Sequence, residues 1–254
     1  MMPPGKLALG VVLGIAAVFP ASAQNNPKVA WNLSVWGPPR AFTAGIETLA
    51  KYVEKESGGS FTIKVHYGDA LSKGPDNLDN IKLGAFEMAQ ICTGYHPGKN
   101  PGLTVLDLPG LPLADPDIHG KVHDAIYKHP FIVAEFKKWN AIPFMSVLQP
   151  QSEFMGVGDP PRTMDGFKGM RVRALGGTGD ALKNLGAVPT SVPAPEVYNA
   201  LERGVFQAAA FPFTFARSGR TTASKIRFSS PPSSTRTPLR RNIAAASCTC
   251  CSAS

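Results

Sequence analysis

The chain has 254 residues and a formal net charge of +8, with 26 basic and 18 acidic side chains. Seven of the basic residues lie in residues 217–254, which contain no acidic residue, so the rest of the chain has 19 basic against 18 acidic side chains. A nearly neutral body without aromatic residues interleaved among basic ones excludes a nucleic-acid-binding function, and its length is sufficient for one large or two ordinary domains.

The N-terminus has the pattern of a secretory signal peptide at residues 1–23. Lys6 precedes an apolar run of thirteen residues, 7–19, and Ala21-Ser22-Ala23 is a small-residue cleavage site. As a helix the apolar run would rise only about 20 Å, less than the roughly 30 Å hydrocarbon core of a bilayer, which disfavours the alternative of a permanent membrane anchor. We therefore expect an exported, soluble, periplasmic protein.

Residues 24–149 predict a first α/β lobe with a connecting helix. Alternating apolar and polar residues predict strands at residues 31–36, 61–67 and 86–91. Apolar residues at helical spacing, followed by glycines that stop each helix, predict helices at residues 41–56 and 76–83. The order strand, helix, strand, helix, strand is that of a βαβαβ unit with a parallel sheet.

The second part of this lobe leads toward the next one. We expect an apolar connection at residues 103–113, a helical segment at 115–139 interrupted at Pro130, and a buried strand at 142–150. The chain should then cross between the lobes near residues 149–154, which we interpret as the hinge.

Residues 150–216 predict a second, partial α/β lobe. Met170, Val172 and Ala174 alternate with two arginines, which predicts a strand at residues 170–175 with Arg171 and Arg173 on the same face. After two glycines, Thr178 is expected to cap a helix at residues 179–185. A guanidinium beside a helix N-terminus suits a small anion; the alternative is that both arginines are solvated residues of an exposed face.

The two predicted lobes also match each other at a constant offset of 120 residues. LDNIKLGAFEMA at 78–89 aligns with YNALERGVFQAA at 198–209, with glycine on glycine and phenylalanine on phenylalanine. We interpret this match as two similar lobes. A chance recurrence of helix, glycine and strand is the alternative.

Three segments carry a resemblance to a known family. FKGMRVR at 167–173, LGAVPTSV at 185–192 and PEVYNALERGVFQAA at 195–209 follow in order and spacing the pattern of the periplasmic solute-binding proteins of TRAP transporters (tripartite ATP-independent periplasmic systems, DctP type). The resemblance covers residues 31–215. It implies a two-lobed α/β periplasmic binding protein architecture that captures an organic acid and delivers it to membrane permease subunits. Because those transporters are driven by an ion gradient, it implies no nucleotide and no cofactor.

The resemblance also implies roles for individual residues. Arg173 falls on the arginine that forms a salt bridge with the ligand carboxylate, with Arg171 as a weaker candidate. Glu153 stands where many members have a second ligand-facing arginine, and Phe211 replaces an acidic or amide residue with an apolar wall. A monocarboxylate with an apolar body fits this combination best.

Loop ends supply further candidates, because ligands in such folds bind at the carboxyl ends of strands. The loops at residues 38–40, 93–96 and 151–153 are placed there. Trp36 and Tyr95 would supply apolar faces, and Gln151 lies at the expected crossing between the lobes. Ordinary packing or a solvated loop is the alternative for each.

An exported α/β enzyme that acts on a small organic acid is the alternative class of function. His119 and His123 lie four residues apart and could bind zinc, but Gly120 stands where HExxH has its general base, so they are otherwise expected on the helix surface. GGTGD at 176–180 lacks the Lys-Ser/Thr of a phosphate-binding loop, and GxSxG does not occur. We therefore expect no catalytic residue and no metal.

The sequence changes character after residue 216. Residues 217–254 contain nine Ser, five Thr and three of the four cysteines, which leaves Cys92 as a buried thiol of the body without a disulfide partner. Such composition predicts a disordered basic tail. Because the resembled family continues with segments that complete both lobes, we interpret the change as a truncation or frameshift, with a natural tail as the alternative. An incomplete chain would be marginally stable and unable to bind productively.

Overall fold

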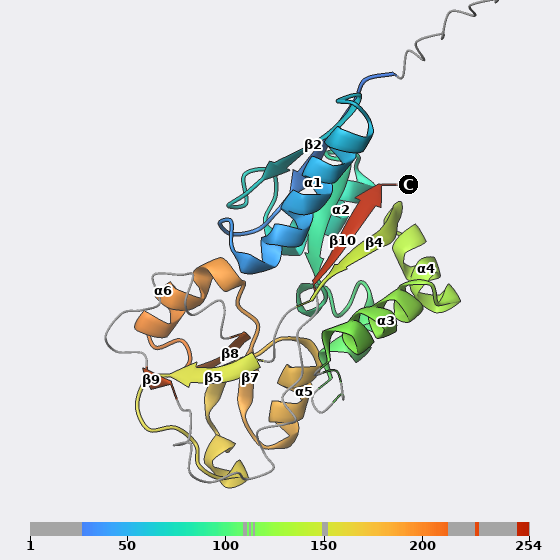
Figure 1. The fold of residues 1–254 in the computed structure, drawn as a ribbon. Helices are drawn as coiled ribbons and strands as arrows, with labels where there is room; N and C mark the ends of the chain where they lie inside the picture. The colour runs from blue at the N-terminus through green and yellow to red at the C-terminus, as the bar shows by residue number, and fades with distance from the viewer. Residues whose placement is uncertain are drawn as a thin grey trace, which may run out of the picture.

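The computed structural model describes residues 27–108, 111, 113, 115–148 and 152–212, together with the backbone of two short strands at 227–228 and 248–253. It contains two α/β lobes, one above the other in Figure 1, each built on a five-stranded sheet. The predicted signal peptide at residues 1–23 lies outside the described residues. Within the described part of the chain, no helix is both long and apolar enough to cross a membrane.

The first sheet has the strand order β2-β1-β3-β10-β4. β1 (Val29–Ser34) lies parallel to both β2 (Phe61–His66) and β3 (Met88–Cys92). The crossovers contain α1 (Ala44–Glu56) and α2 (Asn77–Lys82), preceded by the short helical turns η1 (Ala41–Thr43) and η2 (Gly74–Asp76). The predicted βαβαβ unit is confirmed. β1 begins earlier than predicted, because Val29 and Ala30 pair with Phe61 and Thr62.

Helices cover both faces of this sheet. Ile46 of α1 packs with Met88 and Cys92 on one face. Side chains of α2, α3 and α4 pack on the other face against Ala89 and Ile91. The alternation of β3 side chains between two cores explains why every residue of this strand is buried.

The connection between the lobes is largely helical. It consists of η3 (Thr93–Tyr95), η4 (Pro101–Asp107), α3 (Pro116–Tyr127), α4 (Pro130–Lys137) and β4 (Ala141–Val147). The predicted interruption at Pro130 is confirmed, since this proline begins α4. The prediction of a buried strand here is wrong. β4 is the edge strand of its sheet, and Ile142 and Phe144 are 43% and 52% exposed.

The second sheet has the strand order β7-β6-β8-β5-β9. β6 (Arg171–Arg173) lies parallel to β7 (Val188–Thr190) and β8 (Ala208–Pro212), and β5 (Ser152–Gly156) is antiparallel to β8 and to β9 (Arg227–Phe228). Its helices are η5 (Met164–Phe167), α5 (Gly176–Asn184), η6 (Ala194–Glu196) and α6 (Val197–Glu202). β6 is shorter than the predicted strand, and α5 begins three residues before its predicted start.

The offset of 120 residues is a true structural repeat. η2 and η6, α2 and α6, and β3 and β8 begin and end 120 residues apart. Each helix is followed by a glycine with positive φ, +70° at Gly84 and +68° at Gly204. The amides of these glycines donate to the carbonyl oxygens of Ile81 and Leu201 at 2.9 and 3.1 Å. The prediction of two similar lobes is therefore confirmed.

β10 (Cys248–Ala253) corrects the prediction for the end of the chain. It lies antiparallel between β3 and β4, and β9 lies at the edge of the second sheet (Figure 1). The prediction of disorder is wrong for these two segments, and the rest of 217–254 lies outside the described residues. The side-chain pattern of the tail did not predict these strands. A strand that pairs with a neighbour on each side is held by main-chain hydrogen bonds and needs no side-chain periodicity.

The two lobes share one hydrophobic core. Leu33, Met88 and Cys92 of the first lobe belong to the same buried cluster as Phe206 and Phe211 of the second. The carboxyl ends of β3 and β8 therefore lie at the junction between the lobes. A site built from both lobes would take its side chains from this junction.

Candidate functional site

Arg173 is the central residue of the junction between the lobes. It is the last residue of β6 and is 4% exposed. Its Nε donates to the carbonyl oxygen of Val192 at 2.9 Å, and its Nη1 donates to that of Ala210 at 3.0 Å. The guanidinium carbon lies 4.9 Å from the centre of the Phe211 ring. Backbone carbonyls and an aromatic face thus hold the guanidinium in one orientation.

The positive charge of Arg173 is buried. Burial lowers the pKa of its guanidinium, whereas Tyr95 and Cys92 nearby and a hydrogen bond to Tyr95 raise it. Arginine stays protonated in proteins in spite of such a shift. The ion pairs of Lys99 with Asp79 and of Lys168 with Asp165 do not involve Arg173, and no carboxylate of the described residues pairs with it.

Tyr95 and Trp36 approach Arg173 from the first lobe. The Tyr95 hydroxyl accepts a hydrogen bond from the Ala194 amide of the second lobe at 2.7 Å. The rings of Trp36 and Tyr95 lie edge to face with their centres 5.8 Å apart. The guanidinium carbon of Arg40 lies over the Trp36 ring, 4.6 Å from its centre. Arg40 Nη2 also donates to the Trp36 carbonyl oxygen at 2.8 Å. The structure therefore brings four predicted residues together: Trp36, Tyr95, Arg173 and Phe211.

The remaining predicted site residues lie elsewhere or outside the description. Arg171 is exposed, and its Nη2 donates to the Gly204 carbonyl oxygen at 3.0 Å, away from Tyr95 and Phe211. Glu153 is exposed and is the ladder partner of Phe211 in the pair of β5 and β8. Gln151 lies outside the described residues.

The N-terminus of α5 differs from the prediction. α5 begins at Gly176, so Thr178 is a helical residue and not the cap. Asp107 of the first lobe lies there instead: its Oδ2 is 2.7 Å from the position that a Cβ on Gly176 would take. The expected anion position at this helix is thus filled by a carboxylate of the protein. Sequence reasoning missed Asp107, although a single acidic residue inside the apolar run LTVLDLPGL could have indicated a special role.

The two histidines considered as zinc ligands are buried. His119 and His123 are 3% and 0% exposed, so their expected position on the helix surface is wrong. Their rings lie edge to face at 4.5 Å, and His123 Nδ1 is 2.5 Å from Ser146 Oγ of β4. Burial lowers the pKa of His123 to about 4. Within the described residues, no group of three potential metal ligands is present.

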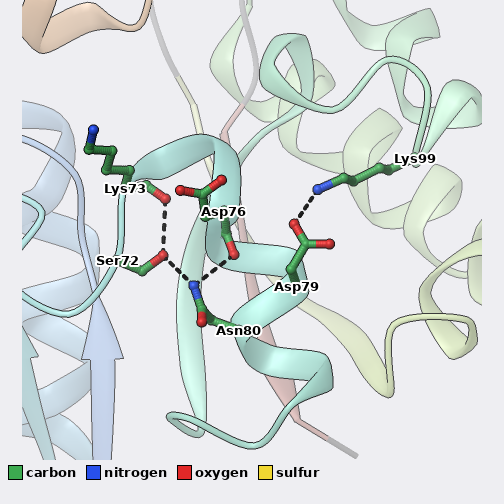
Figure 2. A network of polar contacts seen from close by, with 6 residues as sticks. All are labelled: Ser72, Lys73, Asp76, Asp79, Asn80 and Lys99. Carbon is green, nitrogen blue, oxygen red and sulfur yellow. Dashed lines mark hydrogen bonds and ion pairs between the residues drawn. The ribbon is translucent and has the colours of Figure 1, made fainter.

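A second polar network, shown in Figure 2, has a structural role. The Asn80 amide of α2 donates to Ser72 Oγ at 2.8 Å and to the Asp76 carbonyl oxygen at 3.1 Å, and Lys99 forms an ion pair with Asp79. These contacts join the loop before η2 and the loop after β3 to the same helix. They stabilise the position of α2.

Comparison with known proteins gives the family. The model of bacterial extracellular solute-binding protein, family 7 (DctP), matches residues 34–222. A solute-binding protein of Verminephrobacter eiseniae is 25% identical over 205 residues, which cover 78% of this chain and 58% of that protein. The monocarboxylate 2-oxoacid-binding periplasmic protein of Nostoc sp. is 27% identical over 189 residues, which cover 72% of this chain and 50% of that protein. The chain thus spans between 50% and 58% of the length of these curated relatives.

Solved structures show the same fold. A TRAP solute-binding protein from Rhodoferax ferrireducens, in complex with copurified benzoate, superposes with a TM-score of 0.75 at 20% identity over 89% of this chain and 68% of that chain. A TRAP periplasmic solute-binding protein from Bordetella bronchiseptica with bound (R)- and (S)-mandelate also has a TM-score of 0.75, at 19% identity over 89% and 69%. The predicted two-lobed binding-protein architecture is confirmed.

The family consists of receptors that bind solutes, which supports the prediction that the chain is not an enzyme. The family match begins at Ser34, the last residue of β1, and ends at residue 222, so it includes Trp36, Tyr95, Arg173 and Phe211. The chain therefore belongs to family 7 of the bacterial extracellular solute-binding proteins.

Proposed function

We propose that this chain is the solute-binding component of a TRAP-type transporter and that Arg173 binds the carboxylate of a small organic acid between the lobes. The observation that carries the proposal is the buried guanidinium at the junction, which has no carboxylate partner among the described residues. A desolvated cation that is held only by neutral groups gains most from an anion. A ligand carboxylate supplies that anion in the bidentate geometry that arginine prefers.

The surroundings of Arg173 favour a monocarboxylate with an apolar body. Phe211, Tyr95 and Trp36 supply aromatic surface around one cation. Asp107 already occupies the N-terminus of α5, so this helix end offers no place for a second ligand carboxylate. The relatives that bind benzoate, mandelate and 2-oxo monocarboxylates take ligands of this class.

We further propose a periplasmic location and membrane permease subunits as partners. The family is extracellular, and the N-terminal residues have the pattern of a signal peptide. The permease would recognise the ligand-bound arrangement of the lobes, since closure around the ligand distinguishes loaded from empty receptor. The transporter class requires an ion gradient and no nucleotide.

Isothermal titration calorimetry of the purified full chain tests the proposal. Benzoate, mandelate and pyruvate are the monocarboxylate probes, and succinate is the dicarboxylate control. We expect saturable heat with at least one monocarboxylate, weaker binding of succinate, and recovery of the ligand unchanged. No heat with any probe would contradict the proposal and agree with the alternative expectation, an incomplete chain that cannot bind productively. Consumption of the ligand would indicate an enzyme, and tighter binding of succinate would contradict the monocarboxylate assignment. Mass spectrometry of small molecules released from freshly purified protein would identify the natural ligand.

A further inference from the structure

The N-terminus of α5 has no capping side chain of its own. The residue before the helix is Leu175, which makes no capping hydrogen bond. Thr178 lies inside the first turn, and its Oγ1 makes only a long contact of 3.4 Å with the Asp107 carbonyl oxygen. Because the first N–H groups of a helix have no partner within it, they need an acceptor from another part of the chain.

Asp107 of the first lobe lies where that acceptor is needed. It ends η4 and is 4% exposed. Thr93 Oγ1 donates to its Oδ2 at 2.5 Å, which fixes the carboxylate. The same oxygen lies 2.7 Å from the Cβ position of Gly176, the first residue of α5. A carboxylate at this end of a helix is stabilised by the orphan N–H groups and by the helix dipole.

Glycines allow the lobes to approach this closely. A Cβ on Gly177 would lie 3.1 Å from the Asp107 carbonyl oxygen and 3.0 Å from Leu108 Cδ2. A Cβ on Gly94, in the first lobe, would lie 2.6 Å from Leu175 Cβ. Neither residue has a positive φ, so the backbone conformation does not require glycine there. What requires glycine is the space between the two lobes.

We propose that Asp107 couples the lobes: its carboxylate caps a helix of the second lobe only while the lobes are together, and it thereby stabilises the closed arrangement. α5 follows β6 directly, so the same approach brings Tyr95 of the first lobe to Arg173 and to the Ala194 amide. The inference rests on contacts between the lobes and does not depend on which ligand is bound.

Hydrogen exchange of the ligand-free full chain tests this role. Asp107→Ala should accelerate exchange of the Ala194 amide, whose acceptor lies on the other lobe, and of the first turn of α5, by roughly tenfold. Asp115→Ala is the matched control, because Asp115 caps α3 within the first lobe through the amides of Asp117 and Ile118 at 2.8 and 3.2 Å. The control should accelerate exchange in α3 alone. Wild-type exchange at Ala194 in Asp107→Ala would overturn the proposal.

A pair of glycine variants tests the same contact without removing the carboxylate. Gly177→Ala and Gly179→Ala both add a methyl group to α5 and both raise its helix propensity. Only the first methyl meets the other lobe, since the nearest atom to a Cβ on Gly179 is the Ala174 carbonyl oxygen at 3.4 Å. We expect Gly177→Ala to increase the radius of gyration in small-angle X-ray scattering and the Ala194 exchange rate, and Gly179→Ala to change neither. Identical behaviour of the two variants would contradict the inference, even if Asp107→Ala fails to fold.

Discussion

The two lobes have the same backbone plan, yet they differ at the carboxyl end of the second strand of each sheet, β1 in the first lobe and β6 in the second. At the end of β1, Ser34 pairs with Ala89. At the end of β6, Arg173 pairs with Ala209, which lies 120 residues after Ala89. Ser34 Oγ donates to Asn77 Oδ1 at 3.1 Å, and Asn77 Nδ2 donates to the Gln90 carbonyl oxygen at 3.0 Å. In the first lobe, neutral side chains of the same lobe therefore satisfy this position.

The second lobe places a cation at the equivalent position. Ala208, Ala209 and Ala210 line β8 with small side chains, where β3 has Met88, Ala89 and Gln90. The guanidinium of Arg173 reaches the carbonyl oxygen of Ala210, but a carbonyl compensates only part of a full positive charge. The repeated fold therefore supplies the position at the strand end, whereas residue type and the volume of the neighbouring side chains decide whether the lobe satisfies that position itself or an anion binds there.

Replacing Arg173 with serine, the residue at the equivalent strand end of the first lobe, removes the cation that distinguishes the second lobe. Arg173→Ser should weaken binding of the best monocarboxylate by roughly 2 to 5 kcal/mol, because the charge-assisted pair with the ligand is lost. Calorimetry gives the affinity, and circular dichroism should show a retained fold. Arg171→Ser is the control, since Arg171 is exposed and bound to the Gly204 carbonyl oxygen. Wild-type affinity in Arg173→Ser would refute the assignment of the carboxylate site.

Acid should act on the first lobe, which contains all five histidines. Burial lowers the pKa of His96 to about 4 from an ordinary value of 6.5. The folded state therefore binds fewer protons between these values, so its stability is complete above pH 6.5 and falls as the pH approaches 4, by about 3 kcal/mol for His96. His123, whose pKa is also lowered to about 4, adds to this loss.

Urea denaturation at pH 7.5, 5.5 and 4.5 measures this effect. Tryptophan fluorescence reports on the first lobe, because Trp31, Trp36 and Trp139 all lie in it. His96→Gln should reduce the dependence of the unfolding free energy on pH. An unchanged slope would mean that this histidine is not the group that takes up the proton.

Removing the Tyr95 hydroxyl tests the hydrogen bond by which the first lobe contacts the second lobe beside Arg173. Tyr95→Phe keeps the ring beside Trp36 but removes the acceptor of the Ala194 amide. We expect monocarboxylate affinity to fall by about 1 kcal/mol, the usual contribution of one hydrogen bond. Tyr198→Phe is the control, because its hydroxyl donates to Glu202 on the exposed surface of α6. An equal loss in both variants would show that Tyr95 has no specific role.

The equivalent glycines that follow α2 and α6 allow a test of how similar the two lobes are. Gly84→Ala and Gly204→Ala replace glycines with φ of +70° and +68°, and an added Cβ would meet nothing within 4 Å at either position. Each should lower the free energy of unfolding by about 1 kcal/mol, because only backbone strain changes. Urea denaturation of the two variants should give equal values. A clear inequality would mean that the two turns are not equivalent.

Local patterns predicted most of the backbone. Helical spacing and the stopping glycines placed α1 and α2, and the repeated run around Gly84 and Gly204 identified the two lobes. Alternation could not separate the two arginines, because period two fixes the face of a strand and not the depth. Arg171 is exposed and Arg173 is 4% exposed, since only the latter lies at the strand end that meets the other lobe.

Local sequence patterns were sufficient to predict two α/β lobes and to place Arg171 and Arg173 on one strand, because helix periodicity, glycine stops and strand alternation are local properties. Four features became known from the folded chain alone: Asp107 fills the N-terminus of α5, the Tyr95 hydroxyl bonds across the lobes, His119 and His123 are buried, and β10 enters the first sheet. Each of these depends on two segments far apart in the chain meeting in space, and no local pattern encodes the distance between them.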